Sequence, residues 1–159
     1  MPELRPESGS SLKSKKIAVV AAKWNSFVTD EMLDGAVAAL KAKGVEEDNI
    51  ITLRCPGSFE LPLASKYCID HLKADAVVAI GAVIRGGTPH FDYVCDAVTR
   101  GITDLNMNSG VPVAFGVLTT DTVEQATERA GLDKGNKGAE AALSAIEMLL
   151  LKGAIMHEG

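Results

Sequence analysis

The sequence of 159 residues is poor in features that mark several large classes of protein. Aromatic residues make up only 4% of the chain, and no apolar run approaches the length of a membrane span. Because no hydrophobic signal core follows Met1 either, we expect a cytoplasmic protein. The formal net charge of −5, with no basic block to offset it, argues against general nucleic-acid binding.

Cysteine is scarce as well. Cys55, Cys68 and Cys95 are odd in number and lack the spacing of metal ligands. No neighbouring pattern marks any of the three as an activated thiolate. They are typical of reduced thiols in a cytosolic protein, which agrees with the expected location.

What the chain does contain is 47% apolar residues, rich in Ala and Val, which suits one domain with a tightly packed core. Residues 1–15 carry Pro, Ser, Gly and charge, and we expect a flexible arm outside the core, followed by a single domain at 16–159. Buried-strand patterns alternate with helical periodicity. The expected strands are 16–22, 49–54, 76–83 and 111–118, and the expected helices are 27–43, 60–72, 89–107, a short one after Thr122, and 139–151.

This alternation predicts a parallel sheet covered by helices on both faces. In such sheets, ligands bind outside the carboxyl ends of the strands. Four unusual turns lie at these ends, at 23–26, 56–60, 85–90 and 115–120. Because these turns share one edge of the sheet, together they indicate a binding site more strongly than any one alone.

The turn at 85–90 is the most informative of the four. A buried strand enters it, and Arg-Gly-Gly makes it flexible and polar. Thr88 suits a helix cap and Pro89 suits the first helical position, so His90 falls in the first turn of the next helix. Such a junction favours an anion such as phosphate, and the helix dipole favours a neutral, proton-exchanging His90. The alternative is an ordinary loop with a surface histidine.

Side chains in the first two turns suit a planar, hydroxylated ligand. Trp24, the only tryptophan, either offers a face for a heterocycle to stack on or closes the edge of the core. Asn25 either meets a polyol or uracil edge or simply forms the turn. Glu60 suits sugar hydroxyls or the positive end of a helix, and Ser58 suits the cap of that helix.

Two cations later in the chain are candidates for anion binding. Arg129 ends the short helix, where it suits bidentate phosphate binding or a partnership with the negative helix end. Lys137 lies in a Gly-Asn-Lys-Gly turn with an anion-binding shape. Phe115 lies inside the fourth predicted strand, where a core position is the simplest interpretation.

Taken in their order along the chain, several of these segments resemble one known family. Their combination is far more specific than any segment alone. From residue 16 to about 151, the chain resembles the 6,7-dimethyl-8-ribityllumazine synthases. The motifs that carry the resemblance are Ala-Lys-Trp-Asn at 22–25, Pro-Gly-Ser-Phe-Glu-Leu-Pro at 56–62, the stretch 81–94, Phe-Gly-Val-Leu-Thr-Thr at 115–120, Glu-Gln-Ala at 124–126 with Arg-Ala-Gly at 129–131, and Gly-Asn-Lys-Gly at 135–138.

The resemblance implies a transferase of riboflavin biosynthesis. Members condense 5-amino-6-(D-ribitylamino)uracil with 3,4-dihydroxy-2-butanone 4-phosphate to give the lumazine, phosphate and water, with no metal or organic cofactor. The implied fold is α/β, a three-layer αβα flavodoxin-like sandwich with a four-stranded parallel sheet. The implied assembly is a homopentamer with active sites between adjacent subunits, which some members stack into an icosahedral shell. Riboflavin synthase is an implied partner.

The resemblance also implies a role for each matching residue. His90 is the implied proton shuttle, and Gly87 and Thr88 are implied to bind the phosphate. The residues implied to line the pocket for the pyrimidine ring and the ribityl chain are Trp24, Asn25, Ser58, Phe59, Glu60, Val83 and Ile84. Those implied to come from the neighbouring subunit are Phe115, Arg129 and Lys137.

Three other functions stay open from the sequence. A flavin-binding electron carrier of similar fold lacks support, because no Ser/Thr-rich phosphate loop follows the first strand. A purely structural shell has no need of His90, Arg129 and Lys137 together. An archaeal-type riboflavin synthase would use two lumazines and no butanone phosphate.

Overall fold

The structure is a computed structural model that describes residues 3–5, 12–132 and 134–156. At its centre is one sheet of four parallel strands in the order β2-β1-β3-β4. The strands are β1 (Ile17–Ala22), β2 (Ile50–Cys55), β3 (Ala76–Ile84) and β4 (Val113–Thr120). The register brings Ala22 level with Cys55 and Ile84 level with Thr120, so the turns that follow the strands meet at one edge of the sheet.

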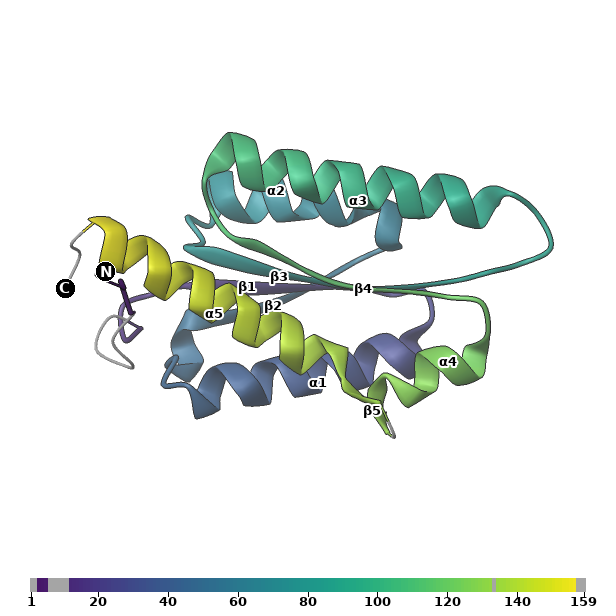
Figure 1. Cartoon of the computed structure of the whole chain (residues 1–159), viewed down its shortest axis with the longest axis horizontal. Helices are drawn as coiled ribbons and strands as arrows, with labels where there is room; N and C mark the ends of the chain where they lie inside the picture. Colours follow the sequence, from purple (N-terminus) through teal and green to yellow (C-terminus); the bar gives the residue numbers. More distant parts are fainter. Residues whose placement is uncertain (1–2, 6–11, 133, 157–159) are drawn as a thin grey trace.

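Helices cover both faces of the sheet (Figure 1). On one side lie α2 (Leu61–His71) and α3 (His90–Ser109). On the other side lie α1 (Ser26–Ala42), α4 (Val123–Glu128) and α5 (Lys137–Met156). The four-stranded parallel sheet and the helical layer on each of its faces make three layers, which confirms the expected α/β sandwich. No helix in the described part of the chain is both long and apolar enough to cross a membrane.

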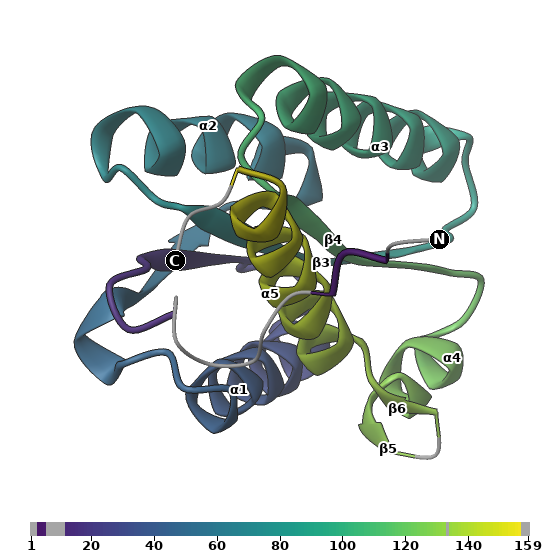
Figure 2. The same cartoon turned by 60° about the vertical axis from the view of Figure 1, so that its left-hand side comes forward.

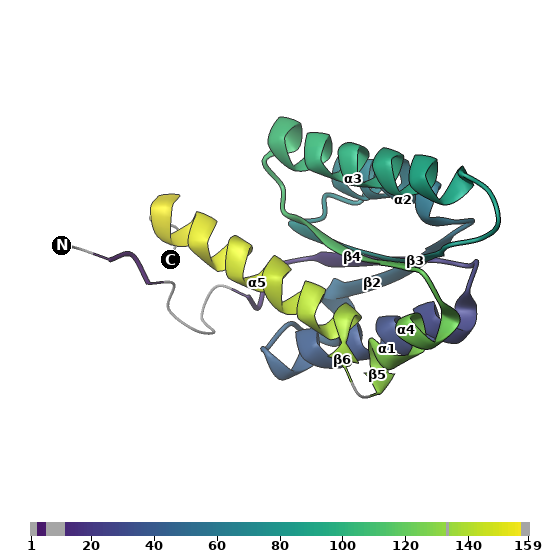
Figure 3. The same cartoon turned by 45° about the vertical axis from the view of Figure 1, so that its right-hand side comes forward.

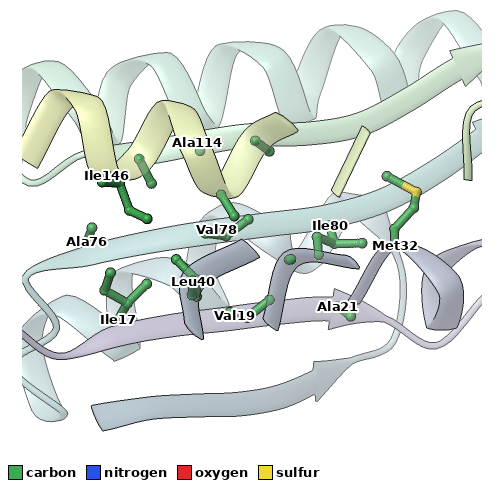
Figure 4. Packing of buried hydrophobic residues seen from close by; sticks show 14 of the residues in the cluster. Ile17, Val19, Ala21, Met32, Leu40, Ala76, Val78, Ile80, Ala114 and Ile146 are labelled. Atoms are coloured by element: carbon green, nitrogen blue, oxygen red, sulfur yellow. The ribbon is translucent and has the colours of Figure 1, made fainter. Parts of the chain in front are cut away.

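The core has two halves because neighbouring residues of each strand point to opposite faces of the sheet. The half on the α1 and α5 side includes Ile17, Val19, Met32, Leu40 and Ile80 (Figure 4). The half on the α2 and α3 side includes Ala18, Val20, Leu61, Val77 and Val98. Since burial of one such large side chain stabilises the fold by about 1.5–3 kcal/mol, the sheet is a rigid platform for the turns at its edge.

Most element boundaries lie within two residues of the predicted ones, and the main difference is at the last helix. We expected a turn at 131–138 and a helix at 139–151, whereas α5 starts at Lys137 and runs to Met156. Two short strands, β5 (Ala130–Leu132) and β6 (Gly135–Asn136), form an unpredicted antiparallel pair beside the start of α5 (Figures 2 and 3). Two single-turn 3₁₀ helices, at Glu47–Asn49 and Ser58–Glu60, precede β2 and α2.

Leu12 corrects the expectation that residues 1–15 stay outside the core. Its side chain is only 1% exposed and belongs to the buried cluster beneath α1 and α5. The backbone N–H of Lys15 donates to the Leu12 carbonyl in a turn that leads into β1. The apolar core therefore begins before residue 16, because one leucine in a polar segment is enough to anchor it. Residues 1–2 and 6–11 of the expected arm lie outside the described part.

Candidate functional site

The turns after β1, β2 and β3 surround a hollow with a volume of about 440 Å³, which we name the tryptophan hollow. Its lining combines exposed aromatic rings with backbone and small polar groups. The predicted site residues that line it are Trp24, Asn25, Ser58, Phe59, Glu60, Val83, Ile84, Thr88 and His90. Ala82, Gly86, Phe91 and Val94 also line it and were not predicted; the last three fall inside the motif 81–94 already singled out.

Trp24 faces the hollow and does not close the core. Its side chain is 64% exposed, while its backbone N–H donates to the Pro56 carbonyl at 3.1 Å. The indole ring lies directly against Gly57, where an added Cβ would overlap the ring. Gly57 thus supplies the space for the indole, and the exposed face is available for stacking.

Asn25 forms the turn after β1 and also lines the hollow. Its backbone is left-handed, with φ of 61°, as expected of a turn-forming asparagine. Its side-chain Nδ2 donates to the Ala82 carbonyl at 2.8 Å, which ties the turn after β1 to β3. The amide nitrogen is therefore used by the protein, and the amide oxygen is the atom suited to a ligand donor.

The turn after β2 presents three consecutive site residues on the 3₁₀ helix Ser58–Glu60. The Glu60 carboxylate accepts from the Gly57 N–H at 3.1 Å, a local capping bond at the start of the helix. Ser58 is buried and lies where a side chain on Gly81 would collide with it. Phe59 is exposed, so it adds a second ring surface to the hollow beside Trp24.

The loop from β3 to α3 confirms the predicted position of His90. His90 is the first residue of α3, and Pro89 precedes it with φ of −65°. The Thr88 hydroxyl accepts from the His90 N–H at 3.4 Å, which is a long, weak cap. Gly87 lines neither hollow and has open space around it.

A second hollow of about 360 Å³ lies along the edge strand β4, and we name it the arginine hollow. Its lining residues are 115–120, Arg129, Lys137, Glu140, Ala141 and Ser144. It brings together Phe115, Arg129 and Lys137, the three residues implied to come from a neighbouring subunit. The two hollows share no lining residue.

The residues of the arginine hollow correct two expectations. Phe115 is 44% exposed and not part of the core, because β4 is the edge strand of the sheet. Lys137 is the first residue of α5, not part of a turn, and its ammonium group pairs with Glu140 at 3.2 Å. Arg129 donates from Nη1 to the Gln125 carbonyl at 2.9 Å, which is the helix-end contact considered from the sequence.

The cysteines are inert in this fold. Burial raises the pKa of the Cys55 thiol to about 11, and the neighbouring Glu60 carboxylate adds to the rise. Burial also raises the pKa of Cys68 and of Cys95. All three thiols are therefore protonated near neutral pH, which argues against a nucleophilic role. Within the described residues, no three His, Cys, Asp or Glu side chains gather as metal ligands.

A comparison with protein families assigns this combination of fold and motifs. The family model described as 6,7-dimethyl-8-ribityllumazine synthase matches residues 14–153 of the 159. The match covers both hollows and the whole sheet. The chain therefore belongs to the 6,7-dimethyl-8-ribityllumazine synthase family, whose members are transferases of riboflavin biosynthesis.

Proposed function

We propose that this protein condenses 5-amino-6-(D-ribitylamino)uracil with 3,4-dihydroxy-2-butanone 4-phosphate to form 6,7-dimethyl-8-ribityllumazine, phosphate and water. The observation that carries the proposal is the sorting of the family's site residues into two separate hollows of complementary chemistry. One hollow has stacking surfaces, polar groups and a histidine. The other has two cations and an exposed phenylalanine.

The pyrimidine substrate binds in the tryptophan hollow. Trp24 stacks on the flat ring, since its free face points into the hollow. The Asn25 amide oxygen accepts hydrogen bonds from the ribityl chain or the uracil edge. Glu60 retains acceptor capacity beyond its one bond to Gly57, so it also binds ribityl hydroxyls.

The phosphate substrate binds where the loop 86–89 enters α3. The N-terminus of this 20-residue helix attracts an anion through the helix dipole. Thr88 adds a hydroxyl, and Gly87 allows close approach of the loop because space around it is open. His90, at the same helix end and exposed to the hollow, transfers protons during imine formation, phosphate loss and ring closure.

The arginine hollow of one subunit completes the tryptophan hollow of its neighbour. Arg129 then supplies a bidentate cation to the phosphate group, and Lys137 and Phe115 close over the ring and the ribityl chain. Holding two substrates together in this composite site supplies much of the rate acceleration. The assembly is a homopentamer or a larger shell built from pentamers, and riboflavin synthase is the partner that consumes the product.

The test is an absorbance assay of purified protein with both substrates, with each alone, and with lumazine alone. We expect lumazine to form above the spontaneous rate only when both substrates are present. No rate above background from folded protein contradicts the proposal. Riboflavin from lumazine alone would instead identify a riboflavin synthase, and a reversible flavin redox couple would identify an electron carrier.

A further inference from the structure

The loop that carries the proposed phosphate contacts has few contacts of its own. A Cβ added to Gly86 or Gly87 would have no atom within 4 Å apart from those of the glycine and its two neighbours in the chain. Residues 85–90 are all exposed, and the Thr88 hydroxyl holds the His90 N–H at only 3.4 Å. A catalytic histidine at the end of so open a loop needs another group to fix its position.

Arg85 is that group, because its contacts join both ends of the loop. Its backbone N–H donates to the Thr120 carbonyl at 2.9 Å, which extends the pairing of β3 with β4. Its Nε donates to the Asp121 carboxylate at 2.7 Å, and its Nη1 reaches the Asp92 carboxylate at 3.5 Å. The guanidinium group also lies 4.3 Å from the centre of the Phe91 ring.

Arg85 precedes His90 along the chain and contacts the two residues that follow it, although its own side chain does not line the hollow. Phe91 and Asp92 directly follow His90 in the first turn of α3, and Phe91 is nearly buried. Arg85 does not line the tryptophan hollow, whereas Gly86, His90 and Phe91 do. Arg85 therefore acts on the site from behind the loop.

Arg85 also balances charge beside the proposed phosphate site. Asp92 and Asp121 both pair with it, so without the arginine two carboxylates near the loop 86–89 would lose their counter-charge. A guanidinium group binds two carboxylates and stacks on a ring at the same time. Lysine has a single ammonium group and no planar face, so it would keep the charge but not this geometry.

We propose that Arg85 is a positioning residue that fixes the loop 86–89 and the first turn of α3, and so places His90 and the phosphate contacts. The enzymatic part of this inference depends on the function proposed above. The structural part, that one side chain holds an otherwise unsupported loop in place, does not.

Steady-state kinetics of Arg85→Met, Arg85→Lys, Asp121→Asn and the double variant Arg85→Met/Asp121→Asn test the enzymatic part. We expect Arg85→Met to lower kcat about tenfold and to raise KM for the butanone phosphate about tenfold, with little change in KM for the pyrimidine. Arg85→Lys should change kcat and this KM less, because it retains the positive charge. In the double variant, Asp121→Asn should reverse part of this rise in KM, since it removes one uncompensated carboxylate.

The matched control is Arg100→Met, which removes another exposed arginine from α3. Among the described residues, Arg100 pairs with Asp96 alone, at 2.8 Å, and it lines neither hollow. We expect its kinetics to match those of the unmodified protein. An equal rise of both KM values in Arg85→Met, with no recovery in the double variant, would overturn the enzymatic part.

Hydrogen exchange of the same variants, after their folding has been verified by circular dichroism, tests the structural part without any substrate. We expect the amides of residues 86–92 to exchange several-fold faster in Arg85→Met than in Arg100→Met, and the amides of β3 to be unchanged. Unchanged exchange at 86–92 overturns the positioning role whatever the enzyme makes. If the unmodified protein makes no lumazine but Arg85→Met still speeds exchange at 86–92, the proposed function is overturned and the positioning role remains.

Discussion

The two hollows of this chain are built on different principles. The tryptophan hollow lies where the three neighbouring strands β2, β1 and β3 end. Hydrogen bonds between turns fix its wall: Lys23 N–H to the Cys55 carbonyl, and Trp24 N–H to the Pro56 carbonyl. The arginine hollow lies along an edge strand, with cations on α5 and on the end of α4. One is a rigid, largely neutral recess with exposed rings, and the other is a charged surface.

Under the proposed function, this difference explains why neither hollow is sufficient alone. Trp24 and Phe59 expose large apolar faces, which is costly for a surface unless a ligand covers it. Arg129 and Lys137 already contact the protein's own Gln125 carbonyl and Glu140, so they are held in place before any anion arrives. Each hollow thus offers half of the groups that the proposed two-substrate reaction needs.

The largest expected effect tests whether the two hollows belong to one composite site. Trp24→Ala chains and Arg129→Ala chains should each be nearly inactive, but a mixture that exchanges subunits should regain activity. In a random equal mixture, about one quarter of the interfaces would pair two intact hollows, which sets the scale of the recovery. Native mass spectrometry verifies that mixed assemblies have formed. Mixed assemblies with no recovery would place the site within a single chain.

The next largest effect tests which substrate the arginine hollow binds. Arg129→Ala should raise KM for the butanone phosphate by far more than KM for the pyrimidine, because it loses one bidentate charged contact of about 2–3 kcal/mol. Arg54→Ala is the control, since Arg54 pairs with Asp30 at 2.6 Å and lines neither hollow. Equal changes in both KM values would assign Arg129 a structural role at the helix end.

A smaller effect tests the stacking face of the tryptophan hollow. Riboflavin shares the ribityl chain and the pyrimidine end of the lumazine, so we expect it to bind weakly and to quench both its own and Trp24 fluorescence. Trp24→Ala should weaken this binding by about 1–3 kcal/mol, and Trp24→Phe by less.

Stability measurements provide the control for this titration. Because Trp24 is largely exposed, Trp24→Ala should leave the melting temperature nearly unchanged. A lower melting temperature with unchanged riboflavin affinity per folded protein would mean that the indole is a structural residue.

The sequence predicts the tryptophan hollow better than the arginine hollow, for a physical reason. Strand ends and glycine turns have local patterns, and parallel strands bring their carboxyl ends to one edge, so the position of His90 follows from a few neighbouring residues. The placement of Trp24 does not follow in this way. Whether its ring turns inward or outward depends on Gly57, which lies on another strand's turn.

The arginine hollow depends on sheet order, which local patterns do not specify. Phe115 resembles a core residue in an apolar strand, and only the edge position of β4 exposes it. Lys137 resembles a turn residue, but α5 begins there because Asn136 caps it, with the Ala139 N–H donating to the Asn136 side chain at 3.0 Å. The same asparagine donates to the Glu31 carbonyl at 2.9 Å, a long-range contact that anchors the helix start on α1.

The smallest effect concerns Cys55, which ends β2 just before the turn whose residues Ser58–Glu60 line the tryptophan hollow. The thiol is buried and donates to the Gly57 carbonyl at 3.5 Å, and its pKa is raised from 9.0 to about 11. Between these values the folded protein holds a proton that the unfolded chain has lost. Stability from this group is therefore complete below pH 9 and falls as the pH rises toward 11. From pH 8 to pH 10 the loss should be about 1 kcal/mol.

Urea unfolding of the unmodified protein and of Cys55→Ala at pH 8 and pH 10 measures this contribution. The variant is less stable at both pH values because it leaves a small cavity, but its loss of stability between pH 8 and pH 10 should be smaller by about 1 kcal/mol. Val20→Ala is the matched control, because it removes a buried side chain from the same half of the core but no titratable group. If Cys55→Ala and the unmodified protein lose the same stability between the two pH values, then the thiol has the same pKa in the folded and the unfolded chain, and burial does not raise it.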